Sequence, residues 1–238
     1  MSTILITGAS SGIGRALTLQ LLRQGHVVWG IARNEEKLKQ LSLDAGSPNF
    51  FYTVCDVSDF AGLQRLKDYM DGKGFKPNIL MLNAGITSSI PETNRKTNYE
   101  GVVNAWQVFK ADLRKNGGVV AISGSLFALL PASFNISYSQ SKLDALNFIK
   151  GLAQEKENQS IKFTYFVLGP VNTTPGVTLP LWKSLFIPSA EKTATYITKH
   201  LGSTGLIDIF PVSSKVMILL NAMLPKAVMD RLITFLKR

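Results

Sequence analysis

The chain has 238 residues, 45% of them hydrophobic and 18% charged. This length and composition predict one α/β domain, residues 1–238, with one sizeable core. The formal charge of +10 suits an anionic ligand, a nucleic acid or an anionic membrane, but the basic residues are scattered and not interleaved with aromatics, which argues against nucleic acid. The single cysteine, Cys55, excludes an internal disulfide and fits a reducing compartment.

Short apolar runs alternate with amphipathic stretches along the whole chain. This alternation is typical of successive βαβ units, so we expect a Rossmann-like, doubly wound parallel sheet of about seven strands with helices on both faces. The predicted strands are Ile4–Thr7, Val27–Ile31, Phe50–Cys55, Ile79–Leu82, Val119–Ser123, Phe163–Leu168 and Ile207–Phe210. The predicted helices are Gly12–Gln24, Asn34–Leu41, Phe60–Gly72, Asn94–Lys115, Ser137–Asn158 and Glu191–Leu201.

The first predicted strand begins at Ile4, directly after Met1-Ser2-Thr3. This leaves no room for a signal or transit peptide upstream, so we expect a cytoplasmic protein. We expect residues 1–120 to bind a cofactor, residues 121–212 to carry the chemistry, and residues 213–238 to form an apolar, basic extension.

A glycine-rich segment, Thr7–Gly14, follows the first strand and opens the first helix. Such a turn presents free backbone N–H groups and the positive end of the helix dipole, which together bind a pyrophosphate. The spacing Gly-x-x-x-Gly-x-Gly departs from the commoner dinucleotide pattern, but the glycines have the same physical roles. The residues that we expect to contact a dinucleotide here are Gly8, Ser10, Ser11, Gly12, Ile13 and Gly14.

The second strand ends in Ala32-Arg33, 19 residues after Gly14, with no carboxylate before Glu35. An acidic residue at this place binds a ribose 2′-hydroxyl, whereas an arginine accommodates a 2′-phosphate. We therefore favour NADP(H) over NAD(H), the alternative being that Arg33 is a solvated loop charge.

Polar residues also follow the third and fourth strands, as Asp56-Val57 and Asn83-Ala84-Gly85. Ligands of open parallel sheets bind over the carboxyl ends of the strands. Each segment alone could be ordinary turn chemistry, but together with the glycine turn they indicate contacts to the adenine and ribose of a cofactor.

Tyr138 and Lys142 are four residues apart in a predicted helix, so they lie on one helix face. A cation beside a phenol favours the phenolate, so we expect Lys142 to lower the pKa of Tyr138 toward working pH, as a general acid or base requires. Ser125 at the end of the fifth strand and Asn98 in the preceding helix accompany this pair.

These residues in this order resemble the short-chain dehydrogenase/reductase family over about three quarters of the chain. The resemblance implies that Tyr138 exchanges a proton with the substrate oxygen and that Ser125 polarises that oxygen. It implies further that Lys142 binds the nicotinamide ribose and tunes Tyr138, and that Asn98 anchors a water linked to Lys142. The resemblance also implies cofactor contacts after the sixth strand, at Gly169, Pro170, Val171 and Thr173.

Other residues compete for these roles. Four further serines, Ser123, Ser137, Ser139 and Ser141, lie near Tyr138, but the family's serine-to-tyrosine spacing selects Ser125, and its interval to the serine favours Asn98 over Asn104. His26 and His200 have no carboxylate or serine companion, so neither a hydrolase triad nor a metal site is expected. The chain departs from the family at Leu168-Gly169, where Pro-Gly is usual, and in a shorter stretch between Asn83 and Asn98.

The expected substrate side is apolar. Its candidate residues are Phe127, Leu129, Leu130, Phe134, Ile136, Leu179, Leu181, Trp182, Leu185 and Phe186. Simple core packing accounts for about half of such side chains, while the remainder predict a hydrophobic ketone, aldehyde or secondary alcohol behind a lid that follows Thr173.

Residues 213–238 are the part least like the family. The run 216–224 is too short to span a bilayer and ends at Pro225, and 227–238 is predicted as a basic amphipathic helix. Packing over the pocket, a subunit contact and peripheral docking on an anionic membrane all remain possible.

We therefore expect an NADP(H)-dependent oxidoreductase that interconverts a carbonyl and a secondary alcohol, assembled by resemblance as a homodimer or homotetramer. The alternative is a nucleotide-binding regulatory or scaffold protein without turnover, against which the joint presence of Asn98, Ser125, Tyr138 and Lys142 argues.

Overall fold

The computed structural model describes residues 1–130, 135–174, 180, 186–202 and 205–223. Among them, seven parallel strands form one sheet in the order β3-β2-β1-β4-β5-β6-β7. The strands are β1 (Thr3–Thr7), β2 (Val27–Ala32), β3 (Phe50–Val54), β4 (Ile79–Leu82), β5 (Gly118–Ser123), β6 (Ile161–Leu168) and β7 (Ile207–Phe210). The predicted doubly wound α/β fold is confirmed, and each predicted strand end lies within two residues of the observed one.

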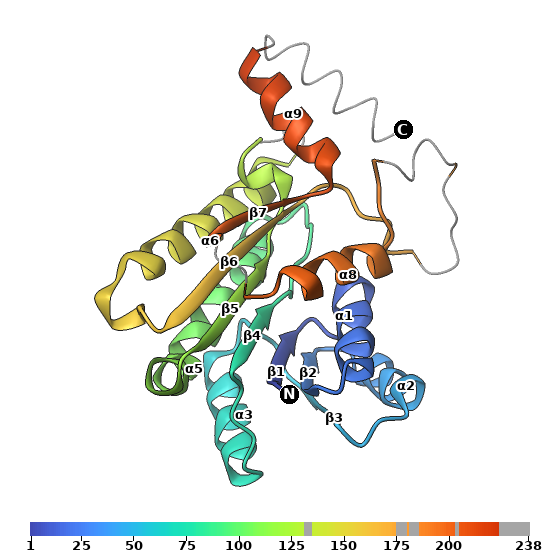
Figure 1. The fold of residues 1–238 in the computed structure, drawn as a ribbon, viewed down its shortest axis with the longest axis vertical. Helices are drawn as coiled ribbons and strands as arrows, with labels where there is room; N and C mark the ends of the chain where they lie inside the picture. The colour runs from blue at the N-terminus through green and yellow to red at the C-terminus, as the bar shows by residue number, and fades with distance from the viewer. Residues whose placement is uncertain (131–134, 175–179, 181–185, 203–204, 224–238) are drawn as a thin grey trace.

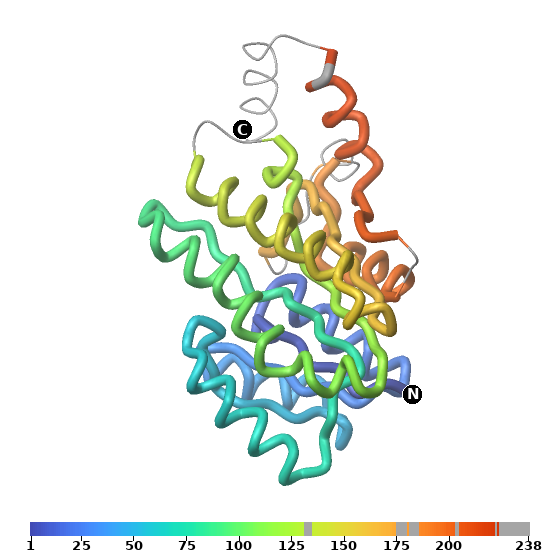
Figure 2. Tube along the Cα trace, turned by 90° about the vertical axis from the view of Figure 1, so that its left-hand side faces the viewer, coloured from blue at the N-terminus to red at the C-terminus, as the bar shows by residue number. Residues whose placement is uncertain are grey.

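Helices cover both faces of this sheet (Figures 1 and 2). One layer holds α1 (Gly12–Arg23), α2 (Glu35–Ala45) and α8 (Ala190–His200). The other holds α3 (Phe60–Gly72), α5 (Gly101–Asn116) and α6 (Ile136–Gln154). Since side chains alternate along a strand, Leu5 joins the core beneath α3, α5 and α6, whereas its neighbours Ile4 and Ile6 join the core beneath α1, α2 and α8.

Two asparagines fix where helices begin at the carboxyl end of the sheet. The Asn34 side chain accepts a hydrogen bond from Lys37 N at 2.8 Å and caps α2, and Asn135 accepts one from Tyr138 N at 3.0 Å and caps α6. Such caps satisfy N–H groups that the first helical turn leaves free. The cap of α6 therefore sets the position of Tyr138 in the first turn of that helix.

The predicted helix 94–115 is helical throughout, but it begins three residues earlier and is not one regular α-helix. The structure has a short helix α4 (Pro91–Arg95), then a π-helical turn at Lys96–Glu100, and only then α5. The π turn carries Asn98, which is buried. Wider π turns occur mostly as single insertions at functional sites, and no local residue pattern announces them.

At the other end of the chain, α9 (Val212–Met223) leaves β7 and projects beyond the carboxyl ends of the strands (Figure 1). Its Met217 and Ile218 pack against the core beneath α6. Within the described part of the chain, no helix combines the length and the hydropathy that crossing a membrane requires. The helix predicted at 227–238 lies outside the described residues.

Candidate active site

A cavity of about 700 Å³ opens over the carboxyl ends of β1, β2, β3 and β4. The glycine turn forms one wall through Gly8, Ser10, Ser11, Gly12 and Ile13, and Asp56, Val57, Asn83, Ala84 and Gly85 contribute as expected from the sequence. Gly14 lines neither this cavity nor the one described below. A Cβ at Gly14 would lie 2.1 Å from the Gly8 carbonyl oxygen, so this glycine permits close packing of α1 on the turn.

Asn83 joins the glycine turn to the two central strands. Its Nδ2 donates to the carbonyl oxygens of Thr7 and Gly8 at 3.2 and 3.3 Å, and its Oδ1 accepts from Ser123 Oγ at 2.9 Å. Thr7 Oγ1 in turn accepts from the backbone N–H groups of Asn83 and Ala84. The turn is therefore held rigidly against β4 and β5, with the N-terminus of α1 beside the cavity.

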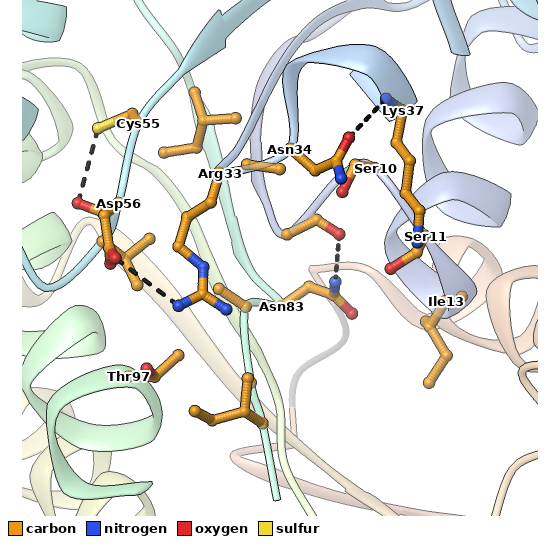
Figure 3. A pocket seen from close by; sticks show the side chains of 18 of the residues that line it. Ser10, Ser11, Ile13, Arg33, Asn34, Lys37, Cys55, Asp56, Asn83 and Thr97 are labelled. Carbon is orange, nitrogen blue, oxygen red and sulfur yellow. Dashed lines mark hydrogen bonds and ion pairs between the residues drawn. The ribbon is translucent and has the colours of Figure 1, made fainter. Parts of the chain in front are cut away.

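Arg33 lines the same cavity and faces Asp56, with 3.9 Å between Arg33 Nη1 and Asp56 Oδ2 (Figure 3). Asp56 Oδ1 is engaged separately, because it accepts from both the backbone N–H and the hydroxyl of Ser58. Lys37, which the sequence reasoning did not select, also lines the cavity, and in Figure 3 its side chain points from α2 toward the glycine turn. Two cations from the β2–α2 connection thus flank one end of the cavity.

A second cavity, of about 600 Å³, continues from the first. The two share the lining residues Ile13, Asn83, Gly85, Ile86 and Thr173. Ser125, Tyr138 and Lys142 line the second cavity, as do Gly169, Pro170 and Val171. The structure thus brings three of the four expected catalytic side chains into one cavity, next to the cavity formed by the glycine turn.

Ser125 and Tyr138 approach each other from neighbouring segments. The hydroxyls of Ser125 and Thr87 face the Tyr138 phenol and lower its pKa, but burial outweighs them and raises the pKa of Tyr138 overall. The expected low pKa of Tyr138 is therefore not observed, and the groups that lower it are Ser125 and Thr87 rather than Lys142. Burial of the phenol, which follows from tertiary packing, penalises the phenolate.

Lys142 is buried and donates from Nζ to the Ser123 carbonyl oxygen at 3.2 Å. Its Nζ lies 5.9 Å from the centre of the Tyr138 ring. Burial lowers the pKa of Lys142 to about 8 because the low-polarity interior disfavours the ammonium. An ammonium of this kind still carries its proton at neutral pH.

Asn98 lines neither cavity, and it links two segments of the site instead. Its Oδ1 accepts from Ile86 N at 2.8 Å, and its Nδ2 donates to Ile86 O at 2.9 Å and to Ser141 Oγ at 3.0 Å. A Cβ at Gly85 would lie 3.0 Å from Lys142 Nζ and 3.2 Å from Asn98 Oδ1. Asn98 and Lys142 therefore converge on Gly85. Asn104, the other candidate for the asparagine of the site, does not reach this loop. It donates to the Val57 carbonyl oxygen, which follows β3.

Packing requires a glycine at position 169, apart from any contact with a cofactor. A Cβ there would lie 2.4 Å from Ser214 Oγ and 3.1 Å from Pro211, so α9 can pack on the end of β6 only if residue 169 lacks a side chain. Thr173 lies against the glycine turn, since a Cβ at Gly12 would meet its side chain at 3.3 Å. The segment after β6 therefore closes over the start of α1.

The apolar wall is partly as expected. Phe127 lines the second cavity with Leu126, Leu168, Ile187 and Met217, and it packs edge-on against the Tyr138 ring. Leu130 is buried, whereas Ile136 and Phe186 are exposed. The other predicted substrate residues Phe134, Leu179, Leu181, Trp182 and Leu185 lie outside the described residues.

Several lining residues were missed by the sequence reasoning. In the first cavity these are Ile31, Ala32, Asn34, Lys37, Cys55, Ile86 and Thr97, and in the second they include Thr87. Lys37 lies in the first turn of α2, shortly after Arg33 and the cap residue Asn34. The described residues contain no group of three or more histidines, cysteines or carboxylates suited to a metal ion.

Comparison with known proteins agrees with this geometry. The family model described as short chain dehydrogenase matches residues 2–182. An NADPH-dependent pterin aldehyde reductase of Arabidopsis thaliana is 31% identical over 165 residues, which cover 64% of this chain and 68% of that protein. A very-long-chain 3-oxoacyl-CoA reductase of Coccidioides immitis is 29% identical over 222 residues, which cover 86% of this chain but only 62% of the relative.

Among solved structures, a short chain dehydrogenase from Burkholderia cenocepacia, in complex with NADP, superposes with a TM-score of 0.81 and 20% identity, covering 97% of each chain. This likeness shows a shared fold. The family model spans well over half of the 238 residues, including the glycine turn, Ser125, Tyr138 and Lys142. The chain belongs to the short-chain dehydrogenase family.

Proposed function

We propose that this protein uses NADPH to reduce the carbonyl group of an apolar substrate to an alcohol, a secondary alcohol where the substrate is a ketone. The single observation that supports this most is that Ser125, Tyr138 and Lys142 together line the second cavity, which continues from the first. A substrate in the second cavity would present its oxygen to the phenol while its carbon faces a nicotinamide at the shared wall.

The first cavity fits a dinucleotide. Its volume of about 700 Å³, its tightly packed glycine turn and the N-terminus of α1 suit a pyrophosphate. Arg33 and Lys37 would hold the 2′-phosphate of NADP(H), and no carboxylate stands at the end of β2 to bind a free 2′-hydroxyl instead. Asp56 and Val57 would contact the adenine, and the segment Gly169–Thr173 the nicotinamide.

When bound, the nicotinamide supplies the hydride. Tyr138 would donate a proton to the substrate oxygen from its phenol, because this side chain lines the second cavity together with Ser125. Ser125 would hydrogen-bond the same oxygen as negative charge develops on it. Lys142 would bind the nicotinamide ribose, and Asn98 would hold the Gly85–Ile86 backbone beside that ammonium.

The lining of the second cavity supports an apolar substrate, since Leu126, Phe127, Ile187 and Met217 line it together with the polar side chains of Ser125, Tyr138 and Lys142. The Coccidioides immitis relative is named for an acyl substrate, and the Arabidopsis thaliana relative for an aldehyde. We expect a ketone or aldehyde on a hydrophobic body.

Peripheral contact with an anionic membrane through the C-terminal segment is part of the proposal. Four side chains form an exposed apolar stripe along α9, Val212, Val216, Leu219 and Met223. The sequence beyond α9 has Lys226, Arg231, Lys237 and Arg238 against one acidic residue, Asp230. Apolar side chains beside basic ones suit an anionic lipid surface. Sedimentation with anionic but not neutral vesicles, abolished by Val216→Glu with Leu219→Glu, tests this contact.

Assembly as a homodimer or homotetramer through the helices that carry Asn98 and Tyr138 stays a prediction, as does a cytoplasmic location. Light scattering of the purified protein measures the first. A monomer at micromolar concentration would contradict it.

The test of the proposed activity is a panel of aliphatic, aromatic and steroidal ketones and aldehydes, assayed by the loss of NADPH absorbance. We expect turnover to rise with the apolar surface of the carbonyl compound. NADPH binding without turnover of any compound would favour the regulatory alternative.

A further inference from the structure

The loop after β4 is held by two asparagines that make the same set of bonds. Asn98 pairs with the backbone N–H and carbonyl of Ile86 and donates to Ser141, as described above. Asn94, four residues earlier, accepts from Ser88 N at 2.8 Å and donates to Ser88 O at 2.8 Å and to Ser137 Oγ at 2.9 Å. Asn94 is completely buried. The second set of bonds therefore repeats the first, one helical turn away.

This second set of bonds reaches the start of the catalytic helix α6. Ser137 Oγ, which accepts from Asn94, donates to Asn135 Oδ1 at 3.1 Å. Asn135 caps Tyr138 N and also donates from Nδ2 to Ser88 O at 3.2 Å. Asn94 thus connects Ser88 on the loop with the turn of helix that carries Tyr138.

Thr87 lies between the two residues that the asparagines hold. It lines the second cavity, and its hydroxyl faces the Tyr138 phenol from the side of the loop, as Ser125 does from the end of β5. The backbone on each side of Thr87 is fixed by an asparagine through both its N–H and its C=O. A hydroxyl held in this way is aimed in advance, which is what proton transfer requires.

We propose that Thr87 is a further catalytic residue, a second hydroxyl that orients the Tyr138 phenol toward the substrate oxygen, and that Asn94 is the positioning residue that holds Thr87 there. The proposal rests on the proton-donor role of Tyr138 given above. The stretch between Asn83 and Asn98 is short. Within it, asparagine or serine side chains bond the backbone of Ile86, Ser88 and Ile90. Thr87, between the first two of these residues, lines the second cavity.

Several groups face Tyr138 and enter any pH argument. They are Ser125 from the end of β5, Thr87 from the loop, Lys142 from α6 and Tyr165 from β6, whose own pKa burial raises. Of these, Thr87 is the group that Asn94 controls. Because the Thr87 hydroxyl, which shares the second cavity with Tyr138, lowers the pKa of that phenol, its loss raises the pKa, so the increase of alcohol oxidation with pH moves to higher pH.

The experiment compares Thr87→Val, Thr87→Ser, Asn94→Ala and the double variant Thr87→Val/Asn94→Ala. We expect Thr87→Val and Asn94→Ala each to lower kcat by about 10-fold, the usual size of one lost hydrogen bond in rate terms, with the KM for NADPH unchanged. Thr87→Ser keeps the hydroxyl and restores most of the rate. The double variant is no slower than either single one, because both remove the same contact.

A spectroscopic readout needs no turnover. The ¹³Cζ resonance of Tyr138, assigned from its absence in Tyr138→Phe, shifts in Thr87→Val and in Asn94→Ala by similar amounts. The matched control is Asn158→Ala, which removes an equally buried asparagine that donates to Leu152 O at 2.9 Å, far from the site. It lowers stability and leaves the resonance and kcat in place. If Asn94→Ala does not fold, Ser137→Ala removes one bond of the same set and gives a smaller change in the same direction.

Two results overturn the inference. One is a double variant whose loss of kcat equals the product of the losses in Thr87→Val and Asn94→Ala. The other is a change in kcat and in the Tyr138 resonance that is no larger in Asn94→Ala than in Asn158→Ala. Failure of the proposed function looks different, because Tyr138→Phe would then remain active whatever happens at Thr87.

Discussion

Lys142 Nζ lies 5.9 Å from the centre of the Tyr138 ring and donates to the Ser123 carbonyl oxygen inside the protein. The helix places the two side chains on one face, and the end of β5 gives the ammonium its partner. Burial acts on them in opposite senses, raising the pKa of Tyr138 and lowering that of Lys142 to about 8. Both shifts reflect the free energy needed to hold charge at this depth.

Replacing Lys142 by methionine should abolish carbonyl reduction and raise stability at pH 7. The folded pKa of about 8 lies below the ordinary 10.5, so the folded ammonium is destabilising below pH 8. Removing it should gain on the order of 1–3 kcal/mol, reduced by the lost bond to Ser123. Urea denaturation of both proteins at pH 7 measures this difference.

The pH dependence of that difference has a definite sign. Between pH 8 and 10.5 the unfolded wild-type chain binds more protons at residue 142 than the folded one, so wild-type stability should rise with pH relative to Lys142→Met. The advantage of the variant should shrink across this interval. An advantage that grows instead would contradict the assigned pKa shift.

Arg33→Asp should change the cofactor preference from NADPH toward NADH. Loss of a charge-assisted contact to a 2′-phosphate should raise the KM for NADPH by about 10- to 100-fold and leave NADH little changed. Arg15→Ala is the matched control, because Arg15 pairs with Asp44 at 2.6 Å and lines neither cavity. An unchanged preference in Arg33→Asp would mean that another group, with Lys37 the first to test, holds the phosphate.

Gly14→Ala should destabilise the protein and weaken NADPH binding together. The added Cβ would lie 2.1 Å from the Gly8 carbonyl oxygen, so the turn must move, at a cost of about 1–3 kcal/mol. Gly151→Ala in α6 meets nothing within 4 Å and should stabilise by up to about 1 kcal/mol. Thermal melting and fluorescence titration with NADPH distinguish the two. Equal behaviour of these variants would refute the packing role of Gly14.

The sheet could be predicted from the sequence because each parallel strand is buried on both faces and reads as a short apolar run. Ile79–Leu82 and Ile207–Phe210 have the predicted ends. The positions of Ser125 and Tyr138 followed from spacing, since Ser125 comes directly after the carboxyl end of β5 and Tyr138 lies in the first turn of α6, and these two ends meet at one edge of the sheet.

The π turn inside the predicted helix 94–115 and the contacts around it could not be predicted in this way. The π turn at Lys96–Glu100 carries Asn98, which bonds the same loop as Asn94 of the preceding helix α4. The pKa of Tyr138 was predicted from its neighbour Lys142 alone, whereas its direction is decided by burial among residues distant in sequence. Lys37 was missed because a lysine on an exposed helix is ordinarily a solvated charge.

The most direct measurement of the central claim compares Tyr138→Phe with the wild type in two assays, NADPH oxidation with an accepted carbonyl compound and NADPH binding by fluorescence. The variant keeps the ring that packs against Phe127 and loses only the hydroxyl. We predict that turnover falls to background while the Kd for NADPH stays within about threefold, since the phenol acts on the substrate oxygen. Turnover equal to the wild type would contradict the assignment of Tyr138 as the proton donor.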